Sequence, residues 1–215
     1  MRNYGRAIRH LKRADPVLRR VVAETGPCRL AKELNANQFG ALVDAILYQQ
    51  ISYRAAQSIS RRFQKLFAKQ PGGRGRPPRP PELWAISPRK LRAAGLSRQK
   101  VKYLRDLARH AADGSLMLGR FGRMTDQEVL ENVTQVKGIG AWTGHMFLMF
   151  CLGRPDVLPV GDFGFQCGFR DAYGMKSLPA KRTLEKTAEA WRPYRSVATW
   201  YLWALRRKRT AARRA

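Results

Sequence analysis

One stretch near the middle of the chain, V-K-G-I-G-A-W-T-G-H-M over residues 136–146, restricts the fold more than any other. The segment before it begins with Thr125 and has Glu128 three residues later, which is the pattern of a helix capping box. The segment after it is an apolar run that ends at Gly153. Glycines let the backbone turn sharply, so residues 126–152 are predicted to form two helices joined by a tight hairpin.

Helix start and end signals recur along the rest of the chain. Asp15 before Pro16 is typical of an N-cap followed by proline in the first turn, and Gly26 is typical of a helix end. Ser87 is a further predicted N-cap. No strand pattern or internal repeat rises above this helical background, and 215 residues suffice to bury a core. The sequence therefore predicts an all-α protein.

Two segments depart from the helical pattern. Residues 71–81 contain only Pro, Gly and Arg, which excludes a helix or a central strand. We predict a surface loop there that is partly polyproline II, acting either as a solvated spacer or as a contact for phosphates. Residues 206–215 form a basic tail that we expect to be frayed.

The charge of the chain indicates a polyanionic partner. It has 42 Lys and Arg against 15 Asp and Glu, a net charge of +27, and nucleic acid is the first candidate for such a field. The three cysteines contain no Cys-x-x-Cys pair, so a zinc or iron–sulfur site is not indicated. We expect reduced, buried thiols, no membrane span, no signal peptide and a cytoplasmic location, associated with the nucleoid in a bacterium.

The G-I-G turn admits several interpretations. A dinucleotide fold needs G-x-G-x-x-G after a strand, but Thr143 occupies the third position and a helix precedes the turn. A P-loop needs Gly-Lys-Ser/Thr at a fixed spacing, and this sequence lacks it. At the start of the second helix, the first N–H groups have no intrahelical partners and the helix dipole adds positive potential, which favours phosphate binding. A plain turn between helices is the alternative.

Asp162 is the candidate for chemistry. It lies in R-P-D-V-L-P-V-G-D-F-G-F and is predicted to cap the following helix. Hydrogen bonds from N–H groups favour the charged carboxylate. A rigidly held carboxylate can stabilise a sugar cation and act as a base for water. The roles of helix cap and catalyst are compatible.

Three ordered motifs together resemble the helix-hairpin-helix–Gly/Pro…Asp (HhH-GPD) DNA glycosylases. V-K-G-I-G-A-W-T is followed by Asp162 of L-P-V-G-D, twenty residues after Trp142. L-V-D-A-I-L-Y-Q-Q-I-S and W-R-P-Y-R-S-V-A-T-W-Y-L-W are similar to the 3-methyladenine DNA glycosylase II (AlkA-type) branch. The resemblance runs from about Arg9 to Leu205.

The resemblance implies two helical subdomains flanking an active-site cleft, in a compact form without the N-terminal β-rich domain of longer relatives. Residues 37–160 would form the central subdomain, and residues 1–36 with 161–215 the second. It also implies a DNA glycosylase of base excision repair that flips out alkylated purines and hydrolyses their N-glycosidic bond. The expected substrates are 3-methyladenine and, as a second candidate, 7-methylguanine.

Individual roles follow from the same resemblance. Asp162 matches the catalytic aspartate, and Gln50 falls at the position of the wedge residue, which is often apolar in the family. Backbone carbonyls for a structural Na⁺ or K⁺ would come from Thr134, Val136 and Ile139. The residues assigned to DNA contact are Gly138, Gly140, Thr143, Gln50, Gln49 and Lys137.

Aromatic residues would form the base pocket. Trp142 and Trp203 match pocket positions, with Met146 and Tyr48 helping to line it; core packing is the alternative for Trp203. Stacking suits an alkylated, positively charged purine. Trp142 also stands where bifunctional relatives have a nucleophilic lysine, which predicts no lyase activity. No cysteine follows Cys167, which excludes the iron–sulfur branch.

The predicted partner is double-stranded DNA containing alkylated bases, bound by a monomer that requires no cofactor. Two alternatives remain open at this point. One is a non-catalytic helix-hairpin-helix DNA-binding protein, which would also explain the charge. The other is a glycosylase for other damaged or deaminated bases.

Overall fold

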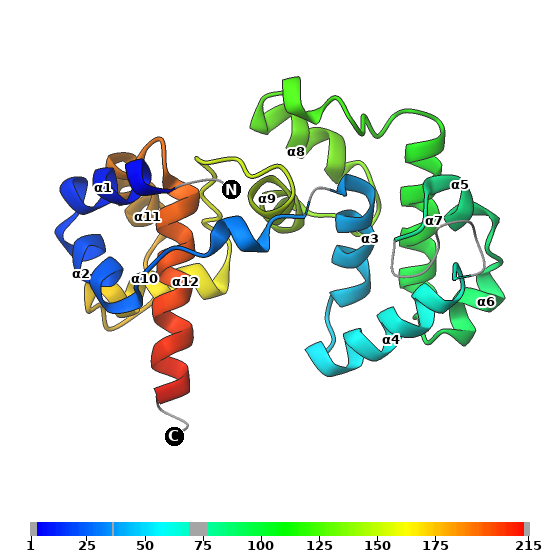
Figure 1. Cartoon of the computed structure of the whole chain (residues 1–215), viewed down its shortest axis with the longest axis horizontal. Helices are drawn as coiled ribbons and strands as arrows, with labels where there is room; N and C mark the ends of the chain where they lie inside the picture. Colours follow the sequence, from blue (N-terminus) through cyan, green and yellow to red (C-terminus); the bar gives the residue numbers. More distant parts are fainter. Residues whose placement is uncertain (1–3, 36, 69–76, 213–215) are drawn as a thin grey trace. The chain divides into compact units, whose positions relative to one another are not determined.

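The structure, a computed structural model, describes residues 4–35, 37–68 and 77–212. Every regular element in these residues is helical, without a β-strand, so the all-α prediction is confirmed (Figure 1). None of the helices in the described ranges combines the length and hydrophobicity needed to cross a membrane.

The chain divides into two compact units. The terminal unit comprises Met1–Leu34 and Leu148–Ala215, and the central unit comprises Asn35–Phe147. The helices of the terminal unit are α1 (Gly5–Ala14), α2 (Pro16–Thr25), η1 (Leu30–Glu33), α10 (Phe163–Tyr173), α11 (Lys181–Ala188), η3 (Glu189–Trp191) and α12 (Arg195–Ala212). Those of the central unit are α3 (Gln38–Tyr48), α4 (Tyr53–Lys65), α5 (Pro80–Ala85), α6 (Pro88–Ala93), α7 (Arg98–Ala112), η2 (Phe121–Arg123) and α8 (Asp126–Thr134). Helix α9 (Ala141–Phe150) contains the boundary between the units.

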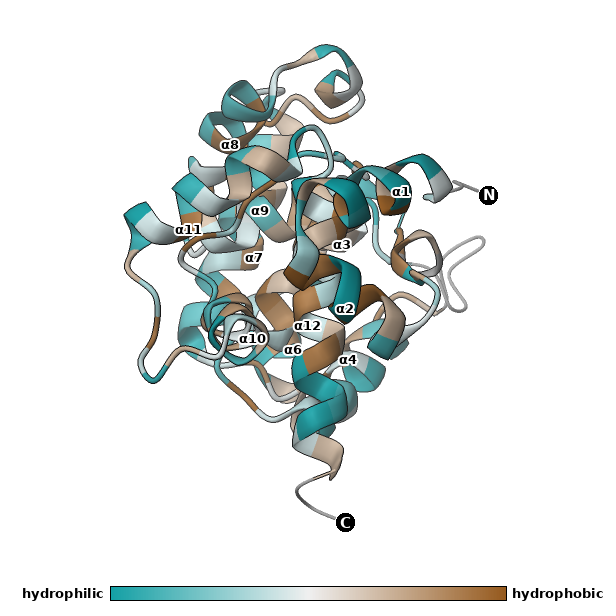
Figure 2. Cartoon of the chain, turned by 90° about the vertical axis from the view of Figure 1, so that its left-hand side faces the viewer, coloured by the Kyte–Doolittle hydropathy of each residue, from teal (hydrophilic) through white to brown (hydrophobic). Residues whose placement is uncertain are grey.

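The terminal unit is built around α12, which packs against α2 and α10. Figure 2 shows hydrophobic segments on α12 near α2 and a hydrophilic C-terminal part of the same helix. Asp15 caps α2 by accepting the N–H groups of Val17 and Leu18, at 2.8 and 3.2 Å. Its other oxygen accepts the indole N–H of the fully buried Trp191 at 2.8 Å. The predicted cap is therefore confirmed, and the same carboxylate satisfies the buried indole of Trp191.

The central unit packs α3 against α4 and α7, and α5 and α6 against α7. The apolar residues Leu42, Ile46 and Leu47 of α3 follow helical spacing and are all buried. On α4, Ala56 and Phe63 are buried likewise, and Phe67 is buried in the turn that follows. Ser52, Ser87 and Ser97 cap α4, α6 and α7 by accepting backbone N–H groups.

The predicted helix–hairpin–helix is present as α8, a turn over residues 135–140, and α9. Thr125 and Glu128 form the expected capping box of α8. A side chain at Gly144 of α9 would approach the Leu130 side chain of α8 within 2.6 Å. Glycine at this position therefore lets the two helices pack closely.

Three expected boundaries differ from the structure. The second unit boundary lies between Phe147 and Leu148 instead of after residue 160, because the segment 154–157 is hydrogen-bonded to the start of α12, as described below. Within the predicted 71–81 loop, residues 71–76 lie outside the described residues, and Pro80 and Pro81 form the first turn of α5. Residues 206–212 of the tail are helical, because α12 continues to Ala212.

Candidate active site

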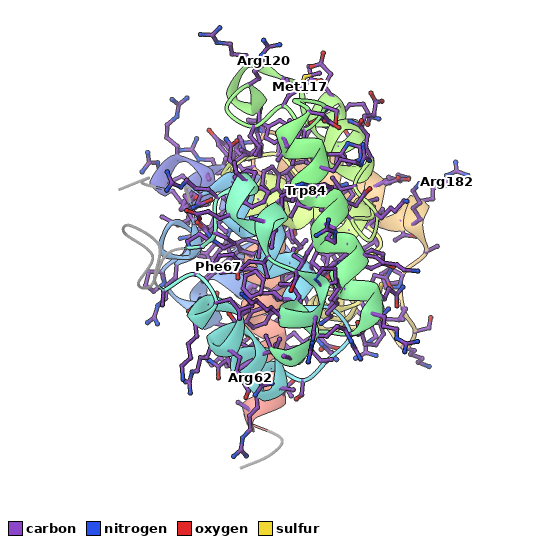
Figure 3. All side chains as sticks on the ribbon, turned by 90° about the vertical axis from the view of Figure 1, so that its right-hand side faces the viewer. Arg62, Phe67, Trp84, Met117, Arg120 and Arg182 are labelled. Carbon is purple, nitrogen blue, oxygen red and sulfur yellow. The ribbon has the colours of Figure 1, made fainter. Side chains whose placement is uncertain are left out.

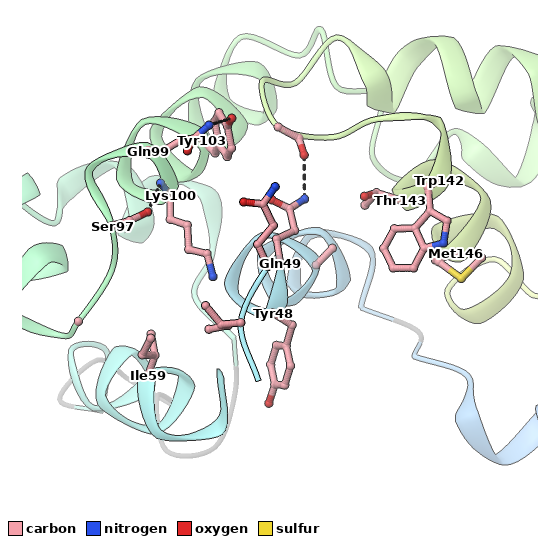
Figure 4. A pocket seen from close by; sticks show the side chains of 15 residues that line it. Tyr48, Gln49, Ile59, Ser97, Gln99, Lys100, Tyr103, Trp142, Thr143 and Met146 are labelled. Carbon is pink, nitrogen blue, oxygen red and sulfur yellow. Dashed lines mark hydrogen bonds between the residues drawn. The ribbon is translucent and has the colours of Figure 1, made fainter. Parts of the chain in front are cut away.

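The central unit contains a pocket of about 790 Å³ between the end of α3, the start of α7 and the start of α9 (Figure 4). It brings together seven residues that the sequence singled out: Tyr48, Gln49, Gln50, Gly138, Trp142, Thr143 and Met146. The side chain of Trp142 is 52% exposed, although it is a large aromatic residue. An exposed indole beside a pocket is available to stack on a planar ligand.

The Q-Q-I-S turn joins α3 to α4 at one side of this pocket. Gln50 has φ of 54° and is the one non-glycine residue with positive φ in the described part of the chain. Such a conformation is costly for a side chain other than glycine and occurs more often at functional sites. Gln49 donates its side-chain amide to the carbonyl of Gly138 at 2.8 Å, which ties the turn to the hairpin (Figure 4).

The two hairpin glycines differ in their surroundings. Gly138 has φ of +84°, and a side chain there would meet the Tyr103 ring at 2.2 Å. Around Gly140, nothing lies within 4 Å of an added Cβ. Gly138 is therefore required by the fold, whereas Gly140 leaves open space directly before α9.

Asp106 of α7 binds the backbone of the hairpin. Its carboxylate accepts the backbone N–H of Lys137 at 2.9 Å and pairs with Arg109 at 3.1 Å. Burial tends to raise the pKa of Asp106, but the hydrogen bonds from Lys137 and Arg109 and the neighbouring positive charges lower it below its ordinary value. The side chain of Lys137 itself remains exposed.

Asp162 lies in the terminal unit and caps α10, as predicted. Its Oδ1 accepts the N–H of Phe165 at 2.5 Å and the indole N–H of Trp203 at 2.7 Å. The residue is only 9% exposed. A side chain at Gly164 would come within 3.1 Å of Asp162 Oδ1 and 3.3 Å of the Trp203 ring, so glycine gives this pair its space.

The loop that leads to Asp162 is fastened to the start of α12. Ser196 donates its hydroxyl to the Arg154 carbonyl at 2.7 Å and accepts the Val157 N–H at 2.9 Å. Asp156 accepts a hydrogen bond from the Arg195 guanidinium at 2.8 Å. The W-R-P-Y-R-S motif thus anchors the R-P-D-V segment.

Several functional candidates were missed from the sequence. Lys100 lines the pocket, with its ammonium 2.5 Å from the carbonyl of Leu47. A signal for it existed: Lys100 lies at the spacing of the apolar residues Leu104 and Leu107 on one face of α7. Asp106 and Tyr103 carried no comparable signal, because their roles depend on a hairpin about thirty residues further along the chain.

The hairpin carbonyls assigned to a monovalent cation are those of Thr134, Val136 and Ile139. Their neutral oxygen atoms are of the kind that Na⁺ and K⁺ accept. The Val136 carbonyl also accepts the Ile139 N–H at 3.0 Å. Among the described residues, no cluster of three or more His, Cys, Asp or Glu side chains could hold a metal.

The cysteines are free, as predicted, but only Cys167 is buried, whereas Cys28 and Cys151 are half-buried. Burial raises the pKa of the Cys151 thiol to about 11, which keeps it protonated at neutral pH.

Comparison with known proteins relates this chain to one family over most of its length. Residues 43–193 match the family described as "HhH-GPD superfamily base excision DNA repair protein". The chain is 31% identical over 196 residues to DNA-3-methyladenine glycosylase 1 of Schizosaccharomyces pombe, covering 90% of this chain and 84% of that protein. With YfjP of Bacillus subtilis it shares 31% identity over 79% of its own length and 59% of that protein, so it spans about three fifths of that relative.

A solved structure is similar over nearly the whole chain. The complex of Schizosaccharomyces pombe 3-methyladenine DNA glycosylase (Mag1) with abasic DNA has a TM-score of 0.76 and 30% sequence identity. The match covers 92% of this chain and 95% of that one.

Proposed function

We propose, from the premise that this chain belongs to the HhH-GPD superfamily of base excision DNA repair proteins, that it is a monofunctional DNA glycosylase that excises alkylated purines such as 3-methyladenine. The observation that carries the proposal is the fixed carboxylate of Asp162, held on one oxygen by the Phe165 N–H and the Trp203 indole. The name of the Schizosaccharomyces pombe 3-methyladenine DNA glycosylase, which this chain resembles in sequence and in structure, supports the substrate class.

In this proposal Asp162 acts on the deoxyribose. The bond between C1′ and the ring nitrogen of the base breaks, and its electron pair leaves with the base. The positive charge that develops on the sugar is stabilised by the nearby carboxylate. Water then adds its oxygen to C1′ and gives a proton to Asp162, which acts as a general base. The products are the free base and an abasic site.

The exposed Trp142 accounts for the preference for alkylated bases. A purine alkylated on a ring nitrogen carries positive charge, and a cation over an indole face gains about 0.5–2 kcal/mol. Met146 and Tyr48 line the same pocket and limit the space around such a base. Because the leaving base becomes neutral on departure, its bond is already labile and modest catalysis suffices.

Trp142 also decides the type of chemistry. It occupies the position at which bifunctional relatives have a nucleophilic lysine, and an indole cannot form a Schiff base. Water is therefore the nucleophile and the strand is not nicked. Borohydride treatment during turnover should trap no covalent protein–DNA adduct; a trapped adduct would refute this part of the proposal.

The remaining assignments concern double-stranded DNA. The N-terminus of α9 at Gly140 and Thr143 would hold a phosphate through backbone N–H groups. Carbonyls of Thr134, Val136 and Ile139 would hold the monovalent cation, which adds positive charge beside that phosphate. Gln50, in its strained turn, would fill the gap left by the flipped base.

The test is a release assay on methylated DNA and on duplexes with single defined lesions. Liberated bases are separated by chromatography, with 3-methyladenine, 7-methylguanine, 1-methyladenine and hypoxanthine as standards. We expect release of 3-methyladenine above the spontaneous rate. Binding to DNA without release of any of these bases would indicate a non-catalytic DNA-binding protein instead.

A further inference from the structure

We infer that Lys100 is a positioning residue for strand opening: its buried ammonium fixes the end of α3 and thereby holds the Gln49–Gln50 turn in the shape that enters the DNA stack. This inference rests on the proposed function, in which that turn supplies the wedge. Lys100 itself touches neither the lesion nor the reacting atoms in this account.

The contact that carries the inference is specific. Lys100 is 9% exposed, and its Nζ lies 2.5 Å from the carbonyl oxygen of Leu47, one residue before the end of α3. Figure 4 shows the Lys100 side chain extending from α7 toward this end of α3. The last carbonyls of a helix have no intrahelical partner and carry the negative end of its dipole, so an ammonium group is well suited to cap them.

The burial of this charge calls for an explanation other than packing. A buried ammonium is costly unless it is paired, and the salt bridges among the described residues include no carboxylate partner for Lys100. Burial accordingly lowers the pKa of Lys100. An apolar side chain would fill the same space without the cost of burying a charge. The charge is therefore better explained by its hydrogen bond to the end of α3.

The turn that follows the end of α3 is strained. Gln50 adopts φ of 54°, which is unfavourable for a non-glycine residue. Lys100 anchors the chain just before this turn, and the 2.8 Å hydrogen bond from Gln49 to Gly138 anchors it within the turn. These two anchors, at Leu47 and at Gln49, restrict the conformations of the turn before DNA binds. The restriction reduces the cost of ordering the turn during base flipping.

The experiment compares Lys100→Met with Lys102→Met, a matched change of an exposed lysine on the same helix. Each variant is assayed under single-turnover conditions on 7-methylguanine in a fully paired duplex and on the same lesion in an unpaired bulge, where little unstacking is needed. Amide hydrogen exchange of the peptide covering residues 47–52 is measured in parallel, without DNA.

We expect Lys100→Met to slow excision from the paired duplex by about tenfold, to change excision from the bulge by less than about threefold, and to accelerate exchange in the turn. Lys102→Met should leave all three unchanged, and Lys100→Arg should recover most of the duplex rate. Gln49→Ala removes the other anchor from a less buried position, so it should reproduce the duplex-specific loss even where Lys100→Met folds poorly.

Equal losses on duplex and bulge, or unchanged exchange in the turn, would overturn the inference. The proposed function fails separately, if the unsubstituted protein excises neither 7-methylguanine substrate and also releases no 3-methyladenine from methylated DNA. In that case the exchange measurement alone decides whether Lys100 orders the turn.

Discussion

At the scale of single residues, the structure separates positions that the sequence treats alike. Gly138 and Gly140 both belong to the predicted hairpin. Only Gly138 has positive φ and faces a ring, that of Tyr103. Packing against Tyr103 therefore explains why residue 138 is a glycine. No such packing surrounds Gly140, so we explain that glycine by the approach of a ligand.

Substituting the two glycines tests this difference. Gly138→Ala should lower the free energy of unfolding by about 1–3 kcal/mol, through backbone strain and displacement of Tyr103. Gly140→Ala should leave thermal stability unchanged but weaken duplex binding, because the added methyl group occupies the space where a phosphate approaches α9. Melting temperatures and DNA titrations distinguish the two effects. An equally stable Gly138→Ala would contradict the structural reason given for that glycine.

Trp203 is a hydrogen-bond donor to Asp162 as well as an aromatic residue. The sequence left it between the base pocket and core packing, whereas the structure places its N–H on Asp162 and stacks its ring on Phe150, with centroids 5.9 Å apart. Trp203→Phe keeps an aromatic ring but removes the donor. We expect the single-turnover rate to fall by about tenfold with little change in DNA affinity. Trp84→Phe, at an exposed tryptophan of α5, serves as control (Figure 3); similar losses in both variants would refute a specific role.

At the scale of elements, helix α7 fixes the hairpin through the hydrogen bond between Asp106 and the Lys137 N–H. The Asp106 carboxylate is stabilised in its charged form, so its pKa is lower in the folded protein than in the unfolded chain. A lowered pKa means that this stabilisation is complete above the ordinary value of 3.8 and is lost as the pH falls through the folded pKa.

The corresponding prediction uses Asp106→Asn. Near neutral pH this variant should be less stable than the unsubstituted protein, and the difference should shrink as the pH falls below about 4. Urea unfolding at a series of pH values measures the difference, and exchange of the Lys137 amide reports on the hairpin directly. A difference that stays constant down to acidic pH would show that the Asp106 charge does not hold the turn.

The capped helices could be predicted from the sequence because caps and apolar spacing are local. Thr125 with Glu128, Asp15 with Pro16, and Ser87 all cap the helices expected of them. The anchors of the functional loops could not be predicted in this way. Ser196 is about forty residues from the segment it holds, and hydrogen bonds over such separations leave no periodic pattern in the sequence.

At the scale of the whole molecule, the division into units shows a similar limit. The family resemblance implied a second boundary after residue 160. The structure places it inside α9, because the hydrogen bonds of Ser196 and Arg195 tie residues 154–157 to α12. Seven of the expected site residues line one pocket of the central unit, and Asp162 contacts Trp203 in the terminal unit, whereas the roles assigned to them stay predictions.

The net charge of +27 predicts strong salt dependence of DNA binding. The logarithm of the binding constant should fall linearly with the logarithm of salt concentration, by about 0.9 per neutralised phosphate. Lys137→Ala should reduce the magnitude of this slope by about 0.9, which corresponds to the loss of one phosphate contact. Lys181→Ala, which removes a lysine outside the predicted contacts, should leave the slope unchanged. Equal slopes for all three proteins would remove Lys137 from the DNA contacts.

The measurement that tests the central claim most directly is the single-turnover release of 3-methyladenine by the unsubstituted protein and by Asp162→Asn, with duplex affinity measured for both. Asparagine retains the oxygen that accepts the Phe165 and Trp203 N–H groups but carries no charge. We predict that Asp162→Asn binds DNA with similar affinity and releases base at least about a hundredfold more slowly. Equal rates from the two proteins would contradict the assignment of Asp162 as the catalytic residue.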